Sequence, residues 1–169
     1  DDSASLSRAL QGDLPDLLDE FLAARQAEGA ALSDVLTQQI SAINDLVDQA
    51  AASAPKRATA QKQALSASIA RILDVVDIPT DRMMQELAVL ATKSDVTEEL
   101  DRLKAHVNTA RDLMSIPKPV GRKLDFLCQE FNREANTLCA KSGDTDLTRI
   151  GLELKARIEQ VREQIQNVE

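Results

Sequence analysis

Aromatic residues and glycine are scarce in this 169-residue chain, which holds three Phe, no Tyr, no Trp and five Gly. A β-sandwich or β-barrel of this length normally carries more aromatic residues in its strands and more glycine in its turns. The apolar 43% consists mainly of Leu, Ala, Ile and Val. Their regular spacing excludes a disordered chain, and their helix-forming tendency predicts an all-α protein.

Long hydrophobic runs and paired cysteine motifs are also missing. No stretch approaches the roughly 20 apolar residues that a membrane-spanning helix needs, and no signal-peptide pattern is present, so we expect a cytoplasmic protein without a membrane partner. The two cysteines, Cys128 and Cys139, lie about 16 Å apart along one predicted helix, too far for a disulfide within it. They form no zinc or redox motif and are predicted to be buried free thiols. The chain starts with Asp1 rather than Met, and we expect a missing N-terminal part.

Acidic residues outnumber basic ones by 28 to 20, which gives a net charge of −8. That sign is unusual for a protein that binds nucleic acid, because such proteins normally present a basic face. The excess is uneven: residues 1–92 carry a net −7, residues 93–142 a net +1 and residues 143–169 a net −2. An anionic partner is therefore expected on segment 93–142, which also holds the single His.

Apolar residues recur at helical spacing through residues 1–79. Asp13-Leu14-Pro15-Asp16 is a typical helix start, since it combines an N-cap carboxylate with a proline in the first turn. We predict one long helix or two abutting helices from there to Ala54-Pro55, and a second helix from about Lys56 that stops before Ile78-Pro79. The two are expected to pair as a long helical hairpin arm, the first predicted domain.

Residues 80–169 are predicted to form a second domain, a C-terminal helical bundle. Helices are expected at 81–92, at 96–114, at 120–140 and from Leu147 to the final residues, because each stretch carries an apolar stripe at helical spacing. In the 96–114 stretch the spacings alternate between four and three, as in a heptad pattern. Asp95 is expected to cap the helix that follows it. Ser142-Gly143-Asp144 is expected to form a turn.

Two sets of polar residues stand out in this second domain. Glu99, Arg102 and His106 fall within an arc of roughly 60° on one helix. Glu99 and His106 could share a divalent ion, or act as a base and its orienting partner; alternatively, Arg102 forms surface ion pairs and His106 simply packs at the helix seam. On the next helix Glu130 and Glu134 are like charges four residues apart, which calls for a cation between them, either Arg133 or a metal.

The same helix carries a polar ladder on another arc, formed by Asp125, Gln129, Asn132 and Asn136. Such a ladder can bind a partner's backbone or hold two helices together. Phe126 is predicted to point outward, where an oligomer contact is a commoner role than a stacking platform for a base.

Several stretches resemble one family of bacterial proteins. They are residues 82–106 (RMMQELAVLATKSDVTEELDRLKAH), residues 121–137 (GRKLDFLCQEFNREANT) with Lys141-Ser142, and residues 153–155 and 162–169. In these stretches the chain resembles the YicC/YloC-like endoribonucleases, closely over residues 82–169 and more loosely over residues 12–81. The resemblance implies a metal-dependent ribonuclease that works within a ring-like homo-oligomer, a hexamer, and it implies an additional N-terminal domain before the segment seen here.

With that resemblance, the polar residues acquire expected roles. The candidates for metal ligands and for the general base are Glu99, His106, Glu130 and Glu134, with Mn²⁺ or Mg²⁺ as the cofactor. The candidates for contacts to RNA phosphates are Arg102, Arg122, Lys123 and Arg133. The ladder of Asp125, Gln129, Asn132 and Asn136 is assigned to oligomer or RNA contacts.

Three alternatives stay open from the sequence. Cleavage could use the 2′-hydroxyl of the RNA, with His106 as base and no metal in the bond-making step. The chain could be a helical scaffold whose polar ladders only hold subunits together, or an RNA-binding regulator that recruits another nuclease. In each RNA-binding case the scarcity of aromatic rings predicts weak recognition of bases and a steep dependence on salt.

Overall fold

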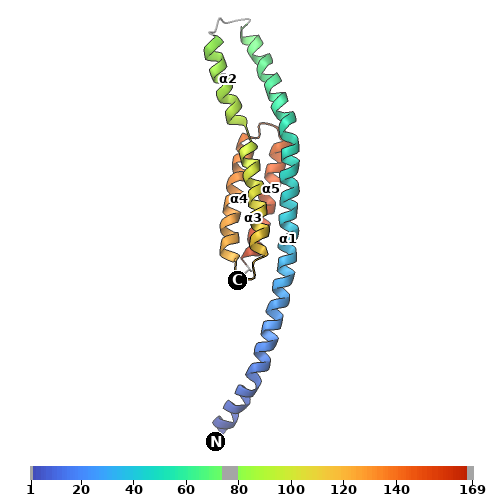
Figure 1. The fold of residues 1–169 in the computed structure, drawn as a ribbon, viewed down its shortest axis with the longest axis vertical. Helices are drawn as coiled ribbons and strands as arrows, with labels where there is room; N and C mark the ends of the chain where they lie inside the picture. Colours follow the sequence, from blue (N-terminus) through green and yellow to red (C-terminus); the bar gives the residue numbers. More distant parts are fainter. Residues whose placement is uncertain (1, 74–79, 167–169) are drawn as a thin grey trace.

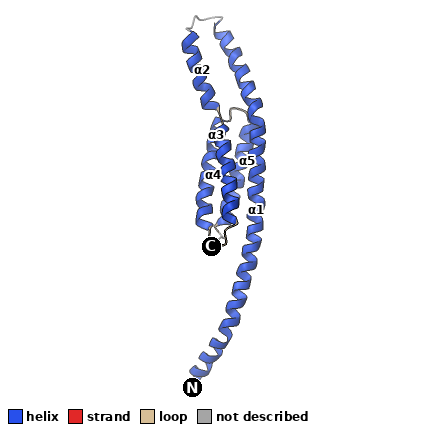
Figure 2. Ribbon diagram, viewed as in Figure 1, coloured by secondary structure: helices blue, strands red, loops and turns tan. Residues whose placement is uncertain are grey.

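The computed structural model describes residues 2–73 and 80–166, and these form five α-helices without a strand (Figure 2). The all-α prediction is therefore confirmed. The helices are α1 (Asp2–Leu73), α2 (Thr80–Ser94), α3 (Thr97–Met114), α4 (Gly121–Lys141) and α5 (Thr145–Ile165). None of the helices in the described ranges is long and apolar enough to cross a membrane.

The core is a four-helix bundle in which α3, α4 and α5 run up and down beside the middle of α1 (Figure 1). Each helix contributes an apolar stripe, as the helical spacing of its apolar residues predicted. Phe131 on α4 is the largest fully buried side chain. Around it pack residues such as Ile43, Leu103, Leu138 and Leu154, all without solvent exposure.

The first helix differs most from the prediction. α1 is continuous over 72 residues, with Pro15 and Pro55 inside it, so the predicted helix start at Asp13-Leu14-Pro15-Asp16 is wrong. The break at Ala54-Pro55, and with it a hairpin folded within the first 79 residues, is also wrong. A proline in a helix interior costs about 3 kcal/mol, and tertiary contacts on either side of Pro55 offset that cost.

Those contacts are an apolar face before the proline and an arginine after it. From Leu36 to Ala50, α1 buries its apolar face in the bundle core. Two residues beyond Pro55, the buried Arg57 donates hydrogen bonds to the carbonyls of Ser94 and Lys141. The helix axis is thereby held on both sides of the proline.

The two ends of α1 extend beyond the bundle (Figure 1). The N-terminal part curves away from the other helices, and the C-terminal part runs beside α2. The predicted stop before Ile78-Pro79, the predicted domain boundary after residue 79 and the predicted extension of the last helix to Val168 lie outside the described residues.

The connections within the bundle follow local sequence signals. The predicted turn at Ser142-Gly143-Asp144 is confirmed, with Gly143 at a φ of 62° that favours glycine. Asp144 caps α5, since its Oδ1 accepts hydrogen bonds from the amides of Asp146 and Leu147 at 2.7 and 3.2 Å. Asp95 accepts a hydrogen bond from the amide of Thr97 at 2.9 Å, just ahead of α3. The N-cap position of α3 is taken by Val96, which has no side-chain cap, so the prediction that Asp95 is the N-cap residue is wrong by one position.

Candidate functional site

The central feature of the predicted site is a cluster of three metal-ligand residues between α3 and α4. The two helices are antiparallel neighbours (Figure 1), so His106 on α3 lies opposite Glu130 and Glu134 on α4. One ring nitrogen of His106 and one oxygen of each carboxylate all lie within 4.8 Å of one another. Glu134 is buried and the other two are half-buried. The structure therefore brings together three of the four predicted ligands.

The imidazole of His106 packs against a neighbouring ring, but one of its nitrogens has no hydrogen-bond partner among the described residues. Its ring meets the ring of Phe131 edge to face, with centroids 5.6 Å apart and planes at 71°. Its Nε2 is buried and has no hydrogen-bond partner within the described part of the chain. A buried polar atom without a partner costs free energy, and such atoms commonly mark a missing ion or water.

Each carboxylate of the cluster is already paired with one arginine. Arg102 Nη1 lies 3.3 Å from Glu134 Oε1, and Arg133 Nη1 lies 3.9 Å from Glu130 Oε2. The other oxygen of each carboxylate accepts no hydrogen bond from the described residues. One oxygen per carboxylate is thus available to a cation, while the two arginines lie at the exposed rim.

Arg102 is held by two carboxylates at once. The hydrogen bond that Arg102 donates to the Glu134 carboxylate, together with the nearby charge of Glu98, raises the pKa of Arg102 above its ordinary value. The guanidinium therefore stays charged on the exposed side of the cluster.

Glu99, the fourth predicted ligand, lies elsewhere. Its Oε1 is 2.8 Å from Nζ of Lys141 at the end of α4. Along α3, Glu99 is seven residues from His106, or about 10 Å. The structure therefore does not bring Glu99 into the cluster. Glu99 instead forms an ion pair with Lys141 that joins α3 to the end of α4.

The two remaining phosphate candidates occupy the start of α4. Arg122 and Lys123 are exposed in its first turn and form no ion pair with the residues described here. They lie about 12 Å along the helix axis from Glu130. They therefore lie beside the cluster along α4 rather than within it.

The predicted polar ladder divides into two parts. Gln129 Nε2 donates to Asp125 Oδ2 at 3.1 Å, and Asp125 Oδ1 lies 3.6 Å from Nε of Arg162 on α5. Asp125 thus holds α4 to α5. Asn132 is half-buried and Asn136 is exposed. Phe126 is exposed, as predicted.

The part of the chain that contains α2 to α5 matches a known protein family. The family described as "Endoribonuclease YicC-like, C-terminal" matches residues 50–169. The chain belongs to this family. All three members of the His106 cluster, and both arginines at its rim, lie within the matched residues.

Two curated relatives carry the same family name. The protein named "Probable endoribonuclease YicC" in Haemophilus influenzae is 40% identical over 169 residues, which cover 99% of this chain and 58% of the relative. Its namesake in Clostridioides difficile is 34% identical over 146 residues, 86% of this chain and 50% of the relative. The YicC-like chain described here therefore spans between half and three fifths of the length of these relatives.

Arg57 is a residue of this YicC-like chain that sequence reasoning missed. It is 7% exposed and donates to the carbonyl of Ser94 at 2.8 Å and to the carbonyl of Lys141. It therefore ties α1 to the last residues of both α2 and α4, including the backbone of Lys141, whose side chain pairs with Glu99. Its local sequence, Ala- and Ser-rich, carries no signal of this role.

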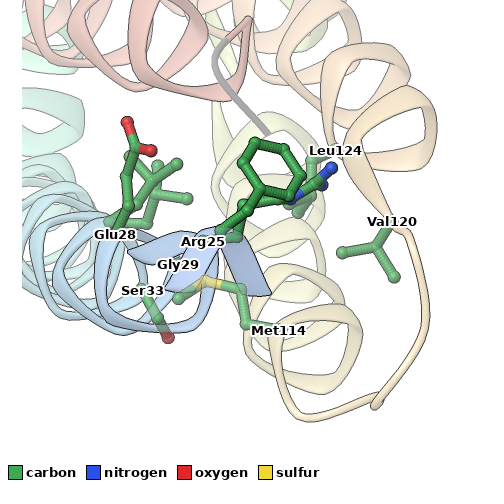
Figure 3. Close-up of a pocket in the computed structure, with 10 residues that line it drawn as sticks. Arg25, Glu28, Gly29, Ser33, Met114, Val120 and Leu124 are labelled. Carbon is green, nitrogen blue, oxygen red and sulfur yellow. The ribbon is translucent and has the colours of Figure 1, made fainter. Parts of the chain in front are cut away.

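A pocket of about 530 Å³ lies apart from the cluster, between α1 and the connection from α3 to α4 (Figure 3). Apolar side chains such as Met114, Val120 and Leu124 form one side, and Arg25 and Glu28 of α1 line the other. None of the predicted site residues lines it. The pocket is therefore separate from the cluster of His106, Glu130 and Glu134 in this YicC-like chain.

Proposed function

We propose that this chain is the helical part of a metal-dependent endoribonuclease, in which His106, Glu130 and Glu134 hold a divalent cation. The observation that carries the proposal is the meeting of one imidazole and two carboxylates from two helices within 4.8 Å. The family description and the names of both relatives supply the reaction class. In this proposal the protein acts as a homo-oligomer, as the sequence resemblance implies.

The residues present fit a divalent cation. The buried Nε2 of His106 lacks a partner, and each carboxylate keeps one free oxygen. Mg²⁺ prefers oxygen ligands alone, whereas a mixed set of one imidazole and two carboxylates suits Mn²⁺ better. Three protein ligands also leave open coordination positions for water and substrate. We therefore propose Mn²⁺ as the better candidate and Mg²⁺ as the second.

The surrounding residues have distinct tasks in phosphodiester hydrolysis. A divalent cation at this site supplies charge stabilisation for the phosphate and makes a water molecule nucleophilic near neutral pH. Arg102 and Arg133 at the rim bind the phosphate oxygens, since a guanidinium matches their geometry. Glu130 would bind the cation through one oxygen, and its Oε2, only loosely paired with Arg133 at 3.9 Å, would accept the proton of the attacking water. Phe131 keeps the imidazole of His106 in its orientation.

RNA recognition in this proposal rests on the phosphate backbone. Exposed aromatic rings for base stacking are scarce. On α4, which carries Glu130 and Glu134, the exposed ring among the described residues is Phe126. The arginines and lysine on α3 and α4 offer positive charge instead. Binding is then expected to depend steeply on salt and weakly on base sequence.

The experiment compares RNA cleavage by the full-length protein with that of three variants, His106→Gln, Glu130→Gln and Glu134→Gln, at a fixed Mn²⁺ concentration. Loss of one ligand is expected to lower cleavage and Mn²⁺ affinity by at least the roughly 10–100-fold that loss of an outer-shell partner costs. Glu153→Gln is the matched control, because Glu153 is an exposed carboxylate on α5 paired with Arg149. Mn²⁺ binding, measured by isothermal titration calorimetry, gives a readout that does not depend on activity.

Two results would contradict this proposal. Cleavage by Glu130→Gln and Glu134→Gln at the wild-type rate would place the chemistry elsewhere, or in a contaminating nuclease. Product ends with a 2′,3′-cyclic phosphate would show attack by the RNA's own 2′-hydroxyl, with His106 as base, and would exclude the hydrolytic step. Hydrolysis by a water molecule is expected to leave product ends with a phosphate monoester instead of a cyclic phosphate.

A further inference from the structure

The pocket between α1 and the connection from α3 to α4 has the size and the lining of a small-ligand site. Its volume of about 530 Å³ falls within the roughly 300–1,000 Å³ of ligand pockets in proteins. Leu36 and Leu124 form its inner wall and are only 4% and 3% exposed. Three polar residues, Arg25, Glu28 and Ser33, line it as well (Figure 3). This mixture suits a flat ligand with apolar faces and polar edges.

Phe21 and Arg25 give this pocket a surface for stacking. Phe21 is 55% exposed, and the guanidinium carbon of Arg25 lies 5.8 Å from the centroid of its ring. At 100° per residue, positions 21, 25 and 28 fall within an arc of about 60°, so all three side chains project from one face of α1. Aromatic rings and guanidinium planes are the side-chain surfaces on which proteins stack unpaired RNA bases. The pocket therefore fits a nucleobase.

Glu28 is the pocket residue that distinguishes one base from another. It is exposed, and its carboxylate has no hydrogen-bond or ion-pair partner in the described part of the chain. A carboxylate only accepts hydrogen bonds. Guanine carries two neighbouring donors on its Watson–Crick edge, N1–H and the N2 amino group, so it satisfies both carboxylate oxygens. Adenine, cytosine and uracil each present one donor beside an acceptor there, which leaves one oxygen facing a lone pair.

The pocket lies within a short length of RNA from the His106 cluster. Leu124 on the pocket wall is about 9 Å from Glu130 along the axis of α4. This corresponds to about three nucleotides at the rise of roughly 3.4 Å per nucleotide in a stacked strand. The exposed Arg122 and Lys123 precede Leu124 in the first turn of α4, and their charges suit the phosphates of such a strand. One RNA strand can therefore reach both the pocket and the cluster.

We propose that this pocket binds one unpaired guanine of the RNA substrate, which stacks on Phe21 and Arg25 and pairs its Watson–Crick edge with Glu28. The proposal rests on the proposed function, because it assigns the pocket to the same RNA that the His106 cluster cleaves. It adds one position of base preference to binding that otherwise follows the phosphate backbone. The expected consequence is a preference for guanine about three nucleotides from the cleaved bond.

Fluorescence anisotropy with the full-length protein tests this preference. The probes are four labelled single-stranded RNAs, all uridine except for one central position that holds G, A, C or U, and EDTA is present so that binding is measured without cleavage. The variants are Glu28→Gln and Phe21→Leu, both at exposed positions, and circular dichroism checks their fold. Glu20→Gln is the matched control, because Glu20 is an exposed carboxylate of the same helix that does not line the pocket.

The wild type and Glu20→Gln are expected to bind the RNA with G about 10-fold more tightly than the other three, as one bidentate base contact provides. Glu28→Gln and Phe21→Leu are expected to bind all four RNAs about equally. Loss of one negative charge raises the affinity for every RNA alike, and the Glu20→Gln control measures that effect.

Equal affinity of the wild type for the four RNAs, or a guanine preference that persists in Glu28→Gln, would overturn the proposal. Competition by free GMP without any difference among the RNAs would indicate a site for a free nucleotide and would also overturn it. Calorimetry of Mn²⁺ binding to Glu28→Gln separates this proposal from the proposed function. Wild-type Mn²⁺ affinity together with no guanine preference in the wild type would reject the base pocket and leave the cation site standing.

Discussion

Lys141 Nζ lies 2.8 Å from Glu99 Oε1 across the interface between α3 and α4. The Glu99 side chain is 6% exposed and that of Lys141 is 28% exposed. Replacement by Lys141→Met leaves the Glu99 carboxylate buried without its cation, which is expected to lower the free energy of unfolding by about 3 kcal/mol in urea denaturation. Because the pair lies outside the His106 cluster, Mn²⁺ affinity is expected to stay unchanged.

The control for this variant is Lys104→Met, since Lys104 pairs with Asp48 at 3.1 Å and both side chains are about half exposed. An exposed pair of this kind contributes less than about 1 kcal/mol. The double variant Glu99→Gln with Lys141→Met is expected to recover part of the lost stability, because no buried charge is left unpaired. Equal losses for Lys141→Met and Lys104→Met would show that burial of the pair has no energetic effect.

The contact of α4 with α5 leaves no room at Gly151. A Cβ added there would lie 2.5 Å from Sγ of Cys139. Gly151→Ala is therefore expected to lower stability by about 1–3 kcal/mol, although alanine is the better helix former. Cys139→Ala removes the sulfur, so the same glycine substitution made in that background is expected to be neutral or stabilising.

A thermodynamic cycle from urea denaturation of the four proteins measures this coupling. Gly29→Ala in α1 is the control, because no atom lies within 4 Å of an added Cβ there. That substitution is expected to raise stability by up to about 1 kcal/mol through helix propensity. The same loss for Gly151→Ala with and without the Cys139 sulfur would contradict the packing account.

Burial raises the pKa of the Cys128 thiol from 9.0 to about 12. Between about pH 9 and 12 the folded state therefore keeps the thiol protonated, whereas the unfolded chain releases the proton. The free energy of unfolding is unaffected by this thiol below pH 9, and it falls by up to about 1.4 kcal/mol per pH unit as pH rises from about 9 to 12. Urea denaturation of the wild type and Cys128→Ala between pH 8 and 10.5 should show a shallower alkaline decline for the variant. Parallel declines would indicate that the folded protein accommodates the thiolate.

The exposed pair Arg122 and Lys123 is expected to contribute charge to RNA binding without serving in chemistry. Replacing both by alanine should weaken RNA binding about equally for different sequences and reduce the slope of log affinity against log salt by about 1–2. Filter binding at several salt concentrations measures the slope. Arg149→Ala with Arg157→Ala on α5 is the matched control, and an equal reduction there would show that these positions on α4 have no special role.

The sequence predicted the helices of the bundle well because their apolar stripes determine which faces are buried. It predicted α1 poorly because Pro15 and Pro55 are strong local signals for helix ends, whereas the contacts that override Pro55 come from distant residues. Arg57 reaches carbonyls 37 and 84 residues away. Local spacing contains no information about such partners.

The candidate site was only partly predicted, again because spacing along one helix does not show which residues of another helix it faces. Spacing on a single helix placed Glu99 and His106 on the same side of α3, and it placed Glu130 and Glu134 together on α4. Only the antiparallel packing of the two helices decides that His106 faces the two carboxylates while Glu99 faces Lys141. The residue types were sufficient to predict a cation site, but which of these residues come together depends on the register between α3 and α4.

The central claim, that His106, Glu130 and Glu134 hold a divalent cation, is tested most directly by anomalous diffraction from crystals grown with Mn²⁺. The predicted result is an anomalous peak between α3 and α4, within bonding distance of the His106 imidazole and of both carboxylates. The peak should vanish in Glu134→Gln crystals grown in the same way. Absence of a peak at this cluster under saturating Mn²⁺ would contradict the account.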